Sequence, residues 1–591
     1  MLNCGSISVS EDNVPVPKSS TSTAPNLELG VPNDQQELVR ERPEWNNQTE
    51  FFFSCISVCV GLGNVWRFPI TAYTNGGGAF VIVYMVVAML IGRFIYFLEL
   101  FVGQFSSNSQ IGIWKMVPFF KGVGIVSLIS MSSIVIYYVY IMALVLHYLF
   151  ASILYEKLPW TEYNENWMNY NNNTNGGLNI SIPEMYFQYE VVKEINTAEI
   201  NGLGYPDCKL ALYLGISWMM IAGSVRNGVK SSGKVAYFTA IIPYIVMGVF
   251  TIRGVILEGG WDGVVYFITP HWNKILEPKI WFEAVIQSFF SLNNGCGANI
   301  MFGSHNPFHH DLFKTSIIIT LVDTSTSLLA GFTIFTTLGN LAAERGMDVS
   351  QVVGEGGPGL VFITYADAIA KFGWFPQLFS VLLFFMLFML GLGTANSCVG
   401  SIVTVLSDSF PNCKWKVLLG CVGVGGFTIG LAYTTPRGLW LMELVSFYSL
   451  SFVIFTTTIL FLIGVTWVYG VEMLLDDIQF MLGTRPGVIF KICVKFIIPS
   501  VMCTILGFML VSGMTPTYQG LEYPFIALAF GWTITAVTLL ILPIAAIHSV
   551  MQMSGCSLRK KLIKSFAPTT SWGPRNPEIK RKWIEFTNIR K

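Results

Sequence analysis

The stretch Ser57-Val-Cys-Val-Gly-Leu-Gly-Asn64 lies in the middle of an apolar run that extends from residue 51 to residue 73. Two glycines and an asparagine within eight residues weaken a helix at membrane depth. Hydrocarbon penalises unpaired backbone polar groups, so irregular backbone persists there only beside a cavity or a ligand. We therefore predict a helix that is interrupted at a binding site.

A second run, from Gln287 to Asn299, also combines two glycines and asparagine with apolar residues. It reads Gln-Ser-Phe-Phe-Ser-Leu-Asn-Asn-Gly-Cys-Gly-Ala-Asn. Interrupted segments at corresponding places of two halves are typical of a site between structural repeats, where helix N-termini attract a carboxylate and freed carbonyls bind a cation. The alternative is that the glycines only let helices pack closely. Two matched segments favour the binding site.

The chain carries apolar segments that are long enough to cross a bilayer of about 30 Å. Of its 591 residues, 53% are hydrophobic and 12% are charged, against about 25% charged in a soluble domain. We predict an all-α membrane protein with about twelve transmembrane helices. The segments are 51–73, 79–104, 123–152, 210–227, 233–257, 281–304, 315–343, 374–407, 416–433, 437–466, 490–513 and 523–550.

Lysines and arginines precede the first segment, join the fourth to the fifth and the eighth to the ninth, and follow residue 555. The positive-inside rule then predicts that both termini are cytoplasmic. The chain divides into a disordered cytoplasmic tail (1–45), a membrane domain (46–555) and a basic cytoplasmic tail (556–591). The extracellular loop at about 153–209 carries glycosylation sequons at Asn172 and Asn179, which agrees with this orientation.

The reactive residue types form no pattern of enzyme chemistry. Eleven cysteines are scattered without a Cys-x-x-Cys pair, and six histidines form no His-Glu-x-x-His motif. A formal net charge of zero gives no reason to expect a nucleic-acid partner. We expect neither an enzyme nor a zinc protein.

Six motifs are distributed along the chain: Gly61-Leu-Gly-Asn-Val-Trp-Arg-Phe-Pro69, Asn75-Gly-Gly-Gly-Ala-Phe80, Gly204-Tyr-Pro-Asp207, Gly228-Val-Lys-Ser-Ser-Gly-Lys234, Gly356-Gly-Pro-Gly359, and Asp476-Asp-Ile478 with Arg485-Pro-Gly487. With these motifs the chain resembles the neurotransmitter:sodium symporter family, and within it chiefly the insect nutrient amino-acid transporters. The resemblance spans residues 40 to 575. It implies a 5+5 inverted repeat with unwound helices 1 and 6, a multi-pass position in the plasma membrane, and symport of a neutral amino acid with sodium by alternating access.

The resemblance implies a substrate pocket between the two interrupted helices. Monoamine carriers of the family have an aspartate where this chain has Gly61, which favours an amino-acid carboxylate over an amine. Tyr138 matches the tyrosine that binds this carboxylate, and Phe290 matches an aromatic lid. Small residues at Cys296 and Cys398 indicate a roomy pocket, unless they are ordinary core packing. The implied set is Gly61, Leu62, Gly63, Ile134, Tyr138, Phe290, Ser291, Asn293, Cys296, Thr394 and Cys398.

The resemblance also implies two cation sites, the first made by the Cys59 carbonyl, Asn64, Ser291 and Asp323. Relatives usually have asparagine at position 323. A buried carboxylate is costly unless it is paired with a cation, so Asp323 indicates strong cation attraction, with potassium as an alternative to sodium. Binding of a proton, or hydrogen bonds to neighbouring hydroxyls, are the other interpretations.

The second implied cation site consists of the carbonyls of Ser57, Val60 and Leu390 with the Thr394 hydroxyl. Relatives have an oxygen-bearing side chain at the position of Gly393, so either water replaces it or the site is weak. Chloride-dependent relatives bind the anion with residues that match Tyr84, Gln287, Ser291 and Ser327. Because Asp323 would supply the negative charge, we expect weak or absent chloride dependence.

Two gates follow from the resemblance. Arg42 and Asp408 match the cytoplasmic gate, with Trp45 nearby. Arg67 and Phe290 match the outer gate. Which acidic residue pairs with Arg67 is undecided, because Ser446 stands where relatives have the acidic partner, and Glu443 lies about one turn away. Glu99 matches a carboxylate that caps the unwound part of helix 6.

Two other functions stay open. One is a non-transporting amino-acid sensor or a leaky cation channel on the same fold. The other is an amine or osmolyte carrier, against which Gly61 counts. We expect a small amino acid and the lipid bilayer as partners.

Overall fold

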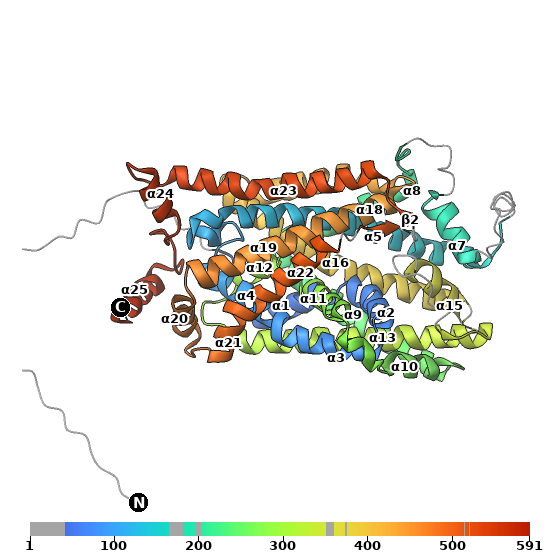
Figure 1. Ribbon diagram of the computed structural model, residues 1–591. Coiled ribbons are helices and arrows are strands. Elements are labelled where there is room, and N and C mark those ends of the chain that lie inside the picture. The colour runs from blue at the N-terminus through green and yellow to red at the C-terminus, as the bar shows by residue number, and fades with distance from the viewer. Residues whose placement is uncertain are drawn as a thin grey trace, which may run out of the picture. The chain divides into compact units, whose positions relative to one another are not determined.

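The computed structural model describes residues 42–164, 181–194, 202–349, 360–370, 372, 375–512, 515–518 and 521–590. The chain separates into two units, 1–42 and 43–591. Most of the described residues of the second unit are helical (Figure 1). The predicted tail up to residue 41, the sequons at Asn172 and Asn179, and the Gly356–Gly359 motif lie outside the described residues.

Ten helical runs are long and apolar enough to cross a bilayer, and an eleventh results if α1 (Gln48–Cys59) is joined to its bent continuation, η1 (Gly63–Arg67) and α2 (Phe68–Thr74). Eleven of the twelve predicted segments are thus confirmed as candidate spans. The ten are Gly78–Ser106 (α3 Gly78–Val87, η2 Ala88–Gly92, α4 Arg93–Ser106), Pro118–Leu154 (η4 Pro118–Phe120, α5 Lys121–Leu154), α8 (Cys208–Val225), α9 (Val229–Ile256), α13 (Leu312–Arg345), α16 (Pro376–Ser409), Trp415–Thr434 (α17 Trp415–Gly430, η11 Leu431–Thr434), Gly438–Val468 (α18 Gly438–Ser446, η12 Phe447–Phe452, α19 Val453–Leu462, η13 Ile463–Val468), Val488–Val511 (α21 Val488–Ile492, η14 Cys493–Ile497, α22 Ile498–Val511) and α23 (Phe525–Gln552).

Local sequence sets where several of these helices begin and end. Asn47, Asp207 and Asp311 are the N-caps of α1, α8 and α13, and each side chain accepts from a backbone N–H of the first turn. Gly346 ends α13 in the left-handed region, with φ at 62°. Large apolar side chains remain exposed along the outer helices, such as Ile252 on α9 and Ile544 on α23. Apolar residues all round a helix are typical of a lipid environment.

Both predicted interruptions are present. The first lies at residues 60–62, where α1 and the following helical run are bent by 43°. The second lies at residues 292–297, between α11 (Pro278–Ser291) and α12 (Ala298–Ser304). Asn293, Gly295 and Gly297 all have positive φ there, at 51°, 78° and 85°. α1 packs against α9 and α16, whereas α12 packs chiefly against α4.

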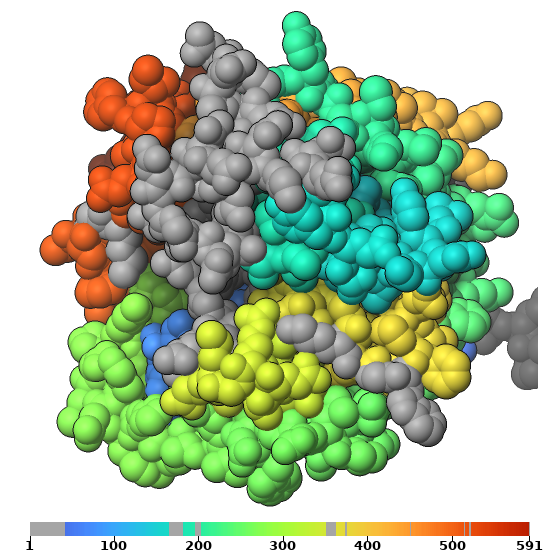
Figure 2. Space-filling model, turned by 90° about the vertical axis from the view of Figure 1, so that its right-hand side faces the viewer, coloured from blue at the N-terminus to red at the C-terminus, as the bar shows by residue number. Residues whose placement is uncertain are grey.

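Short elements cover the two ends of the second unit. α7, α10 and α15 gather at one end and α20, α24 and α25 at the other (Figure 1). In the space-filling view of the first end, blue side chains from the first hundred residues are visible beside green and yellow segments (Figure 2). The short elements of the second unit are η3 (Gly112–Lys115), η5 (Pro159–Thr161), α7 (Ile182–Tyr186), η7 (Phe187–Val191), α10 (Gly260–Ile268), η9 (Trp272–Leu276), η10 (Leu360–Tyr365), α15 (Ala366–Ala370), α20 (Val471–Leu482), β1 (Thr517–Tyr518) paired antiparallel with β2 (Leu521–Glu522), α24 (Leu558–Ser565) and α25 (Pro577–Arg590).

Candidate functional site

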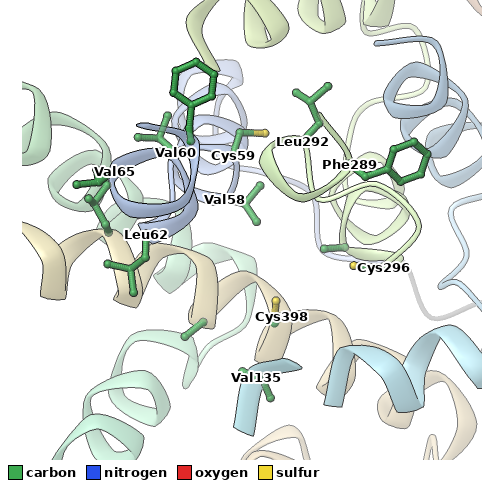
Figure 3. Packing of buried hydrophobic residues seen from close by; sticks show 14 of the residues in the cluster. Val58, Cys59, Val60, Leu62, Val65, Val135, Phe289, Leu292, Cys296 and Cys398 are labelled. Carbon is green, nitrogen blue, oxygen red and sulfur yellow. The ribbon is translucent and has the colours of Figure 1, made fainter. Parts of the chain in front are cut away.

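A cavity of about 410 Å³ lies between the two interruptions. Ten of the eleven predicted pocket residues line it: Gly61, Leu62, Gly63, Ile134, Tyr138, Phe290, Asn293, Cys296, Thr394 and Cys398. The eleventh, Ser291, does not line the cavity and instead bonds to Asp323. In the close-up, the side chains of Val58, Cys296 and Cys398 surround one common space (Figure 3).

Sequence reasoning missed one wall of this cavity. Phe447 and Ser451 of η12 line it together with Ile454 and Phe455 of α19. These four residues follow one another at intervals of four, three and one positions, which places them on one face of a helix. That periodicity was readable in the sequence, but an apolar stripe of this kind is equally typical of a lipid-facing or core-facing helix.

At the first interruption the backbone N–H groups leave the regular helical pattern. Gly61 N–H donates to the Cys59 carbonyl at 3.1 Å, and Asn64 N–H donates to the Gly61 carbonyl at 3.2 Å. In an unbroken α-helix these two donors would bond to Ser57 and Val60. The carbonyls of Ser57 and Val60 therefore lose their helical donors, as backbone ligands for a cation require.

Tyr138 of α5 bonds directly to the first interruption. Its hydroxyl accepts from the Leu62 backbone N–H at 3.2 Å. A Cβ added at Gly61 would lie 3.2 Å from the same hydroxyl and 2.9 Å from Thr394 Oγ1. Position 61 thus has little room for a larger side chain, and glycine keeps the Tyr138 hydroxyl close to the backbone.

At the second interruption the protein's own side chains bind the backbone. Glu99 of α4 accepts from the Gly295 backbone N–H at 2.9 Å and from Asn299 Nδ2 at 2.9 Å. Asn299 Nδ2 also lies 3.1 Å and 3.2 Å from the carbonyls of Leu292 and Asn293. The position of Glu99 agrees with the predicted capping role.

Asp323 of α13 is fully buried and accepts hydrogen bonds from three other helical segments. Ser291 Oγ donates to it at 2.7 Å, Asn64 Nδ2 at 2.8 Å and Tyr84 Oη at 3.2 Å. Asn64 Nδ2 is also 3.2 Å from Ser327 Oγ. The structure thus brings together the side chains of the first predicted cation site and three of the four predicted chloride-site residues.

Thr394 of α16, a predicted ligand of the second cation site, lies next to the first interruption. Its hydroxyl donates to the Leu390 carbonyl at 3.4 Å and faces Gly61. Gly393 is in van der Waals range of Ser57, because a Cβ there would lie 2.8 Å from the Ser57 carbonyl oxygen. The predicted ligands from α1 and α16 are therefore neighbours.

The predicted outer-gate residues meet at the cavity. The Arg67 guanidinium carbon lies 4.5 Å from the centre of the Phe290 ring, in cation–π geometry. Glu443 and Ser446 line the same cavity, and Glu283 and Glu443 are within electrostatic range of Arg67.

The predicted cytoplasmic-gate residues fall in different units. Arg42 belongs to the first unit, whereas Asp408 belongs to the second and accepts from the Ser109 backbone N–H at 3.3 Å. Trp45 packs on Phe302 and His305 at the end of α12. The pairing of Arg42 with Asp408 stays a prediction.

Comparison with known proteins identifies the family. The model of the "sodium:neurotransmitter symporter family" matches residues 42–553. Sodium-dependent nutrient amino acid transporter 1 of Drosophila persimilis is 41% identical, over 98% of this chain and 92% of that protein. Its counterpart in Drosophila melanogaster is 42% identical, over 94% and 91%. The resemblance seen in the motifs is confirmed: this chain belongs to the sodium:neurotransmitter symporter family, a family of transporters and not of enzymes.

Proposed function

We propose that this protein carries neutral amino acids together with sodium across the plasma membrane by alternating access. The cavity between the two interruptions is the observation that carries the proposal. One side of it presents the irregular backbone of residues 61–63 and the Tyr138 hydroxyl, which suit an α-carboxylate. The names of the similar Drosophila proteins support an amino acid as the substrate.

The other side of the cavity supports a neutral substrate side chain. Ile454, Phe455 and Cys296 line it, and the charged residues among the lining, Arg67 and Glu443, belong to the outer gate. Amine carriage is less well supported, because Gly61 offers no carboxylate and has little space for one.

We further propose that sodium binds at both predicted sites, with potassium as a second ion at the first. Asp323 supports the first site, because its carboxylate lies among neutral polar groups and would be balanced by a cation. The released carbonyls of Ser57 and Val60 with the Thr394 hydroxyl support the second. The ions are co-transported substrates in this proposal.

Chloride is dispensable in this proposal. Tyr84 and Ser291, two of the predicted chloride ligands, already donate to the carboxylate of Asp323. Hydroxyl protons that bond to a carboxylate are not free to bond to chloride, and the carboxylate repels a second anion.

The proposed topology has twelve spans, with α11 and α12 as one broken helix, in a 5+5 inverted repeat. Both termini are cytoplasmic, Asn172 and Asn179 are glycosylated outside, and Arg42 pairs with Asp408 at the cytoplasmic gate. Eleven candidate spans, together with the two interruptions, support the number of spans, and the distribution of lysines and arginines supports the orientation.

Uptake of radiolabelled amino acids in oocytes, with current recorded under voltage clamp, tests the proposal. We expect accumulation of neutral amino acids that requires sodium and persists without chloride.

Asp323→Asn is expected to change the sodium and potassium dependence, whereas Asp262→Asn, which alters an exposed carboxylate on α10, serves as the control. Current without accumulation would support a channel instead, and unchanged cation dependence in Asp323→Asn would contradict the role of Asp323.

A further inference from the structure

Ser57 occupies the space that a side chain at position 393 would need. A Cβ built on Gly393 would overlap Ser57 Oγ and would lie 2.8 Å from the carbonyl oxygen of the same serine. Ser57 is 3% exposed, and Gly393 is buried as well. The hydroxyl of Ser57 therefore lies at the contact between α1 and α16, directly against the backbone of residue 393.

A hydrogen bond orients this hydroxyl. Ser57 Oγ and Thr239 Oγ1 of α9 are 2.8 Å apart. Thr239 Oγ1 also has two long contacts to carbonyls of its own helix, 3.3 Å to Val235 and 3.4 Å to Ala236, as a threonine donating back into its helix does. Either hydroxyl can donate in the bond between them; in the arrangement in which Thr239 donates to its own helix, Ser57 donates to Thr239. The lone pairs of Ser57 Oγ then remain available for a cation.

The surroundings are those of the second cation site proposed above. The backbone carbonyl of Ser57 has lost its helical donor, and Gly393 is followed by Thr394, whose hydroxyl faces the same interruption. Gly393 itself has no side-chain oxygen. A small serine-rich cavity adjoins this contact, with Ser54, Ser57 and Gly393 in its wall.

We propose that Ser57 Oγ is a ligand of the second cation site and substitutes, from the opposite wall, for the side-chain oxygen that Gly393 lacks. Ser57 then supplies both a carbonyl and a hydroxyl, and Thr239 is the positioning residue that holds the hydroxyl. Neutral oxygen ligands of this kind suit a hard cation such as sodium. This inference rests on the proposed sodium-coupled transport and explains why the site needs neither an added water nor a loss of affinity.

A reciprocal exchange of the two residues tests the inference. Ser57→Gly is expected to raise the sodium concentration for half-maximal uptake about tenfold, in line with the loss of one hydrogen-bonding oxygen to a charged group. Gly393→Ser alone should impair sodium-dependent uptake, because the new side chain overlaps Ser57 Oγ. The double variant Ser57→Gly with Gly393→Ser should recover sodium dependence to within about threefold of the original protein, since it restores an oxygen from α16 and removes the overlap with Ser57 Oγ, while the new Cβ still requires a small shift away from the carbonyl oxygen of residue 57.

Two controls separate the ligand role from helix packing. Ser54→Ala removes a buried hydroxyl one turn earlier on α1, in the wall of the same cavity, and should leave sodium dependence unchanged. Ser57→Ala keeps helix propensity but lacks the oxygen and should behave like Ser57→Gly, whereas Ser57→Thr should retain sodium affinity. Thr239→Val should weaken sodium affinity by less than Ser57→Ala does.

A second readout is independent of transport. Sodium chloride should raise the melting temperature of the purified full-length protein without substrate, relative to choline chloride at equal ionic strength. The sodium concentration needed for this rise should be lower in the original protein than in Ser57→Ala. If sodium stabilises the original protein at lower concentration than it stabilises Ser57→Ala, but no amino acid is carried, the proposed function fails while Ser57 still stands as a sodium ligand. Normal sodium dependence in Ser57→Ala, or in Gly393→Ser alone, would overturn this inference.

Discussion

Residues 60–62 and residues 292–297 both interrupt an apolar helix at glycine, but their backbone groups meet different partners. In the first interruption, carbonyls such as that of Ser57 lose their helical donors. In the second, Glu99 binds a backbone N–H and Asn299 binds two backbone carbonyls. The first interruption thus keeps oxygen atoms for a ligand, whereas the second is held by the protein itself.

This difference separates two uses of irregular backbone within a membrane. Unpaired polar groups are tolerated there when a cavity or ligand faces them or when neighbouring side chains satisfy them. The first interruption follows the former route and should respond to ions. The second follows the latter and should respond mainly to the loss of its supporting side chains.

The largest expected effect comes from adding a methyl group within the second interruption, compared with a methyl group directly after the first, at Gly63. Gly297→Ala should abolish surface expression, because residue 297 has a φ of 85° and a Cβ there would overlap the buried side-chain amide of Gln110. Gly63→Ala should reach the surface, since a Cβ there meets no atom within 4 Å, and should only alter substrate KM. Surface biotinylation measures both. Equal expression of the two variants would remove the distinction between the interruptions.

Removing the support of the second interruption should have the next largest effect. Glu99→Ala leaves the Gly295 N–H without its acceptor and removes one acceptor of the Asn299 amide, at a cost of about 1–3 kcal/mol for each buried group left unpaired. We expect a lower melting temperature and less surface protein. Glu99→Gln, which keeps one acceptor oxygen, should be intermediate in thermal-unfolding measurements. A Glu99→Ala protein that is fully stable but has altered sodium dependence would show that Glu99 belongs to an ion site instead.

A smaller effect is expected at the first interruption. Tyr138→Phe removes the hydroxyl that accepts from Leu62 N–H and that faces the proposed carboxylate position, so substrate KM should rise about tenfold while surface expression is kept. Tyr140→Phe on the same helix is the matched control, because its buried hydroxyl has no hydrogen-bond partner within the described residues. Uptake kinetics distinguish the two. A fall in expression of Tyr138→Phe without a change in KM would assign this tyrosine to stability.

The smallest effect concerns Asp477 of α20, outside the candidate spans, which like Glu99 is a buried carboxyl that holds a neighbouring segment. It accepts from Trp583 Nε1 of α25 at 2.7 Å and from the hydroxyl of Tyr469. Burial raises its pKa from 3.8 to about 7, although both hydrogen bonds act in the opposite direction. The folded protein therefore favours the protonated form of Asp477 more than the unfolded chain does, and the Trp583 hydrogen bond from α25 reduces this preference.

The contribution of Asp477 to the free energy of unfolding should accordingly be largest below its ordinary pKa, fall as the pH rises, and reach its lower limit above about pH 7. The melting temperature should therefore be lower at pH 8 than at pH 5.5. Asp477→Asn should remove this difference, and its persistence in that variant would assign the pH dependence to another group.

Much of the fold could be predicted because membrane spans and glycine-rich interruptions are local sequence patterns. The Tyr138, Phe290 and Cys398 positions came from motif resemblance, and all three line the observed cavity. The contact of Ser57 with Gly393 could not be predicted, since it depends on how closely α1 and α16 approach. The wall at Phe447 and Ile454 was missed because one apolar helix face looks like another in sequence.

The carboxylate of Asp323 has an electrical consequence. It is attached to α13 and does not leave with the cargo, as a transported chloride ion would. In the proposed cycle the empty carrier would therefore return with an ionised Asp323 in its core, and a membrane potential that is negative inside would drive this charge towards the outside. Complete passage through the field would be worth about 2.3 kcal/mol per 100 mV. The resting potential would thus help to reset the transporter between cycles, in addition to drawing sodium inward.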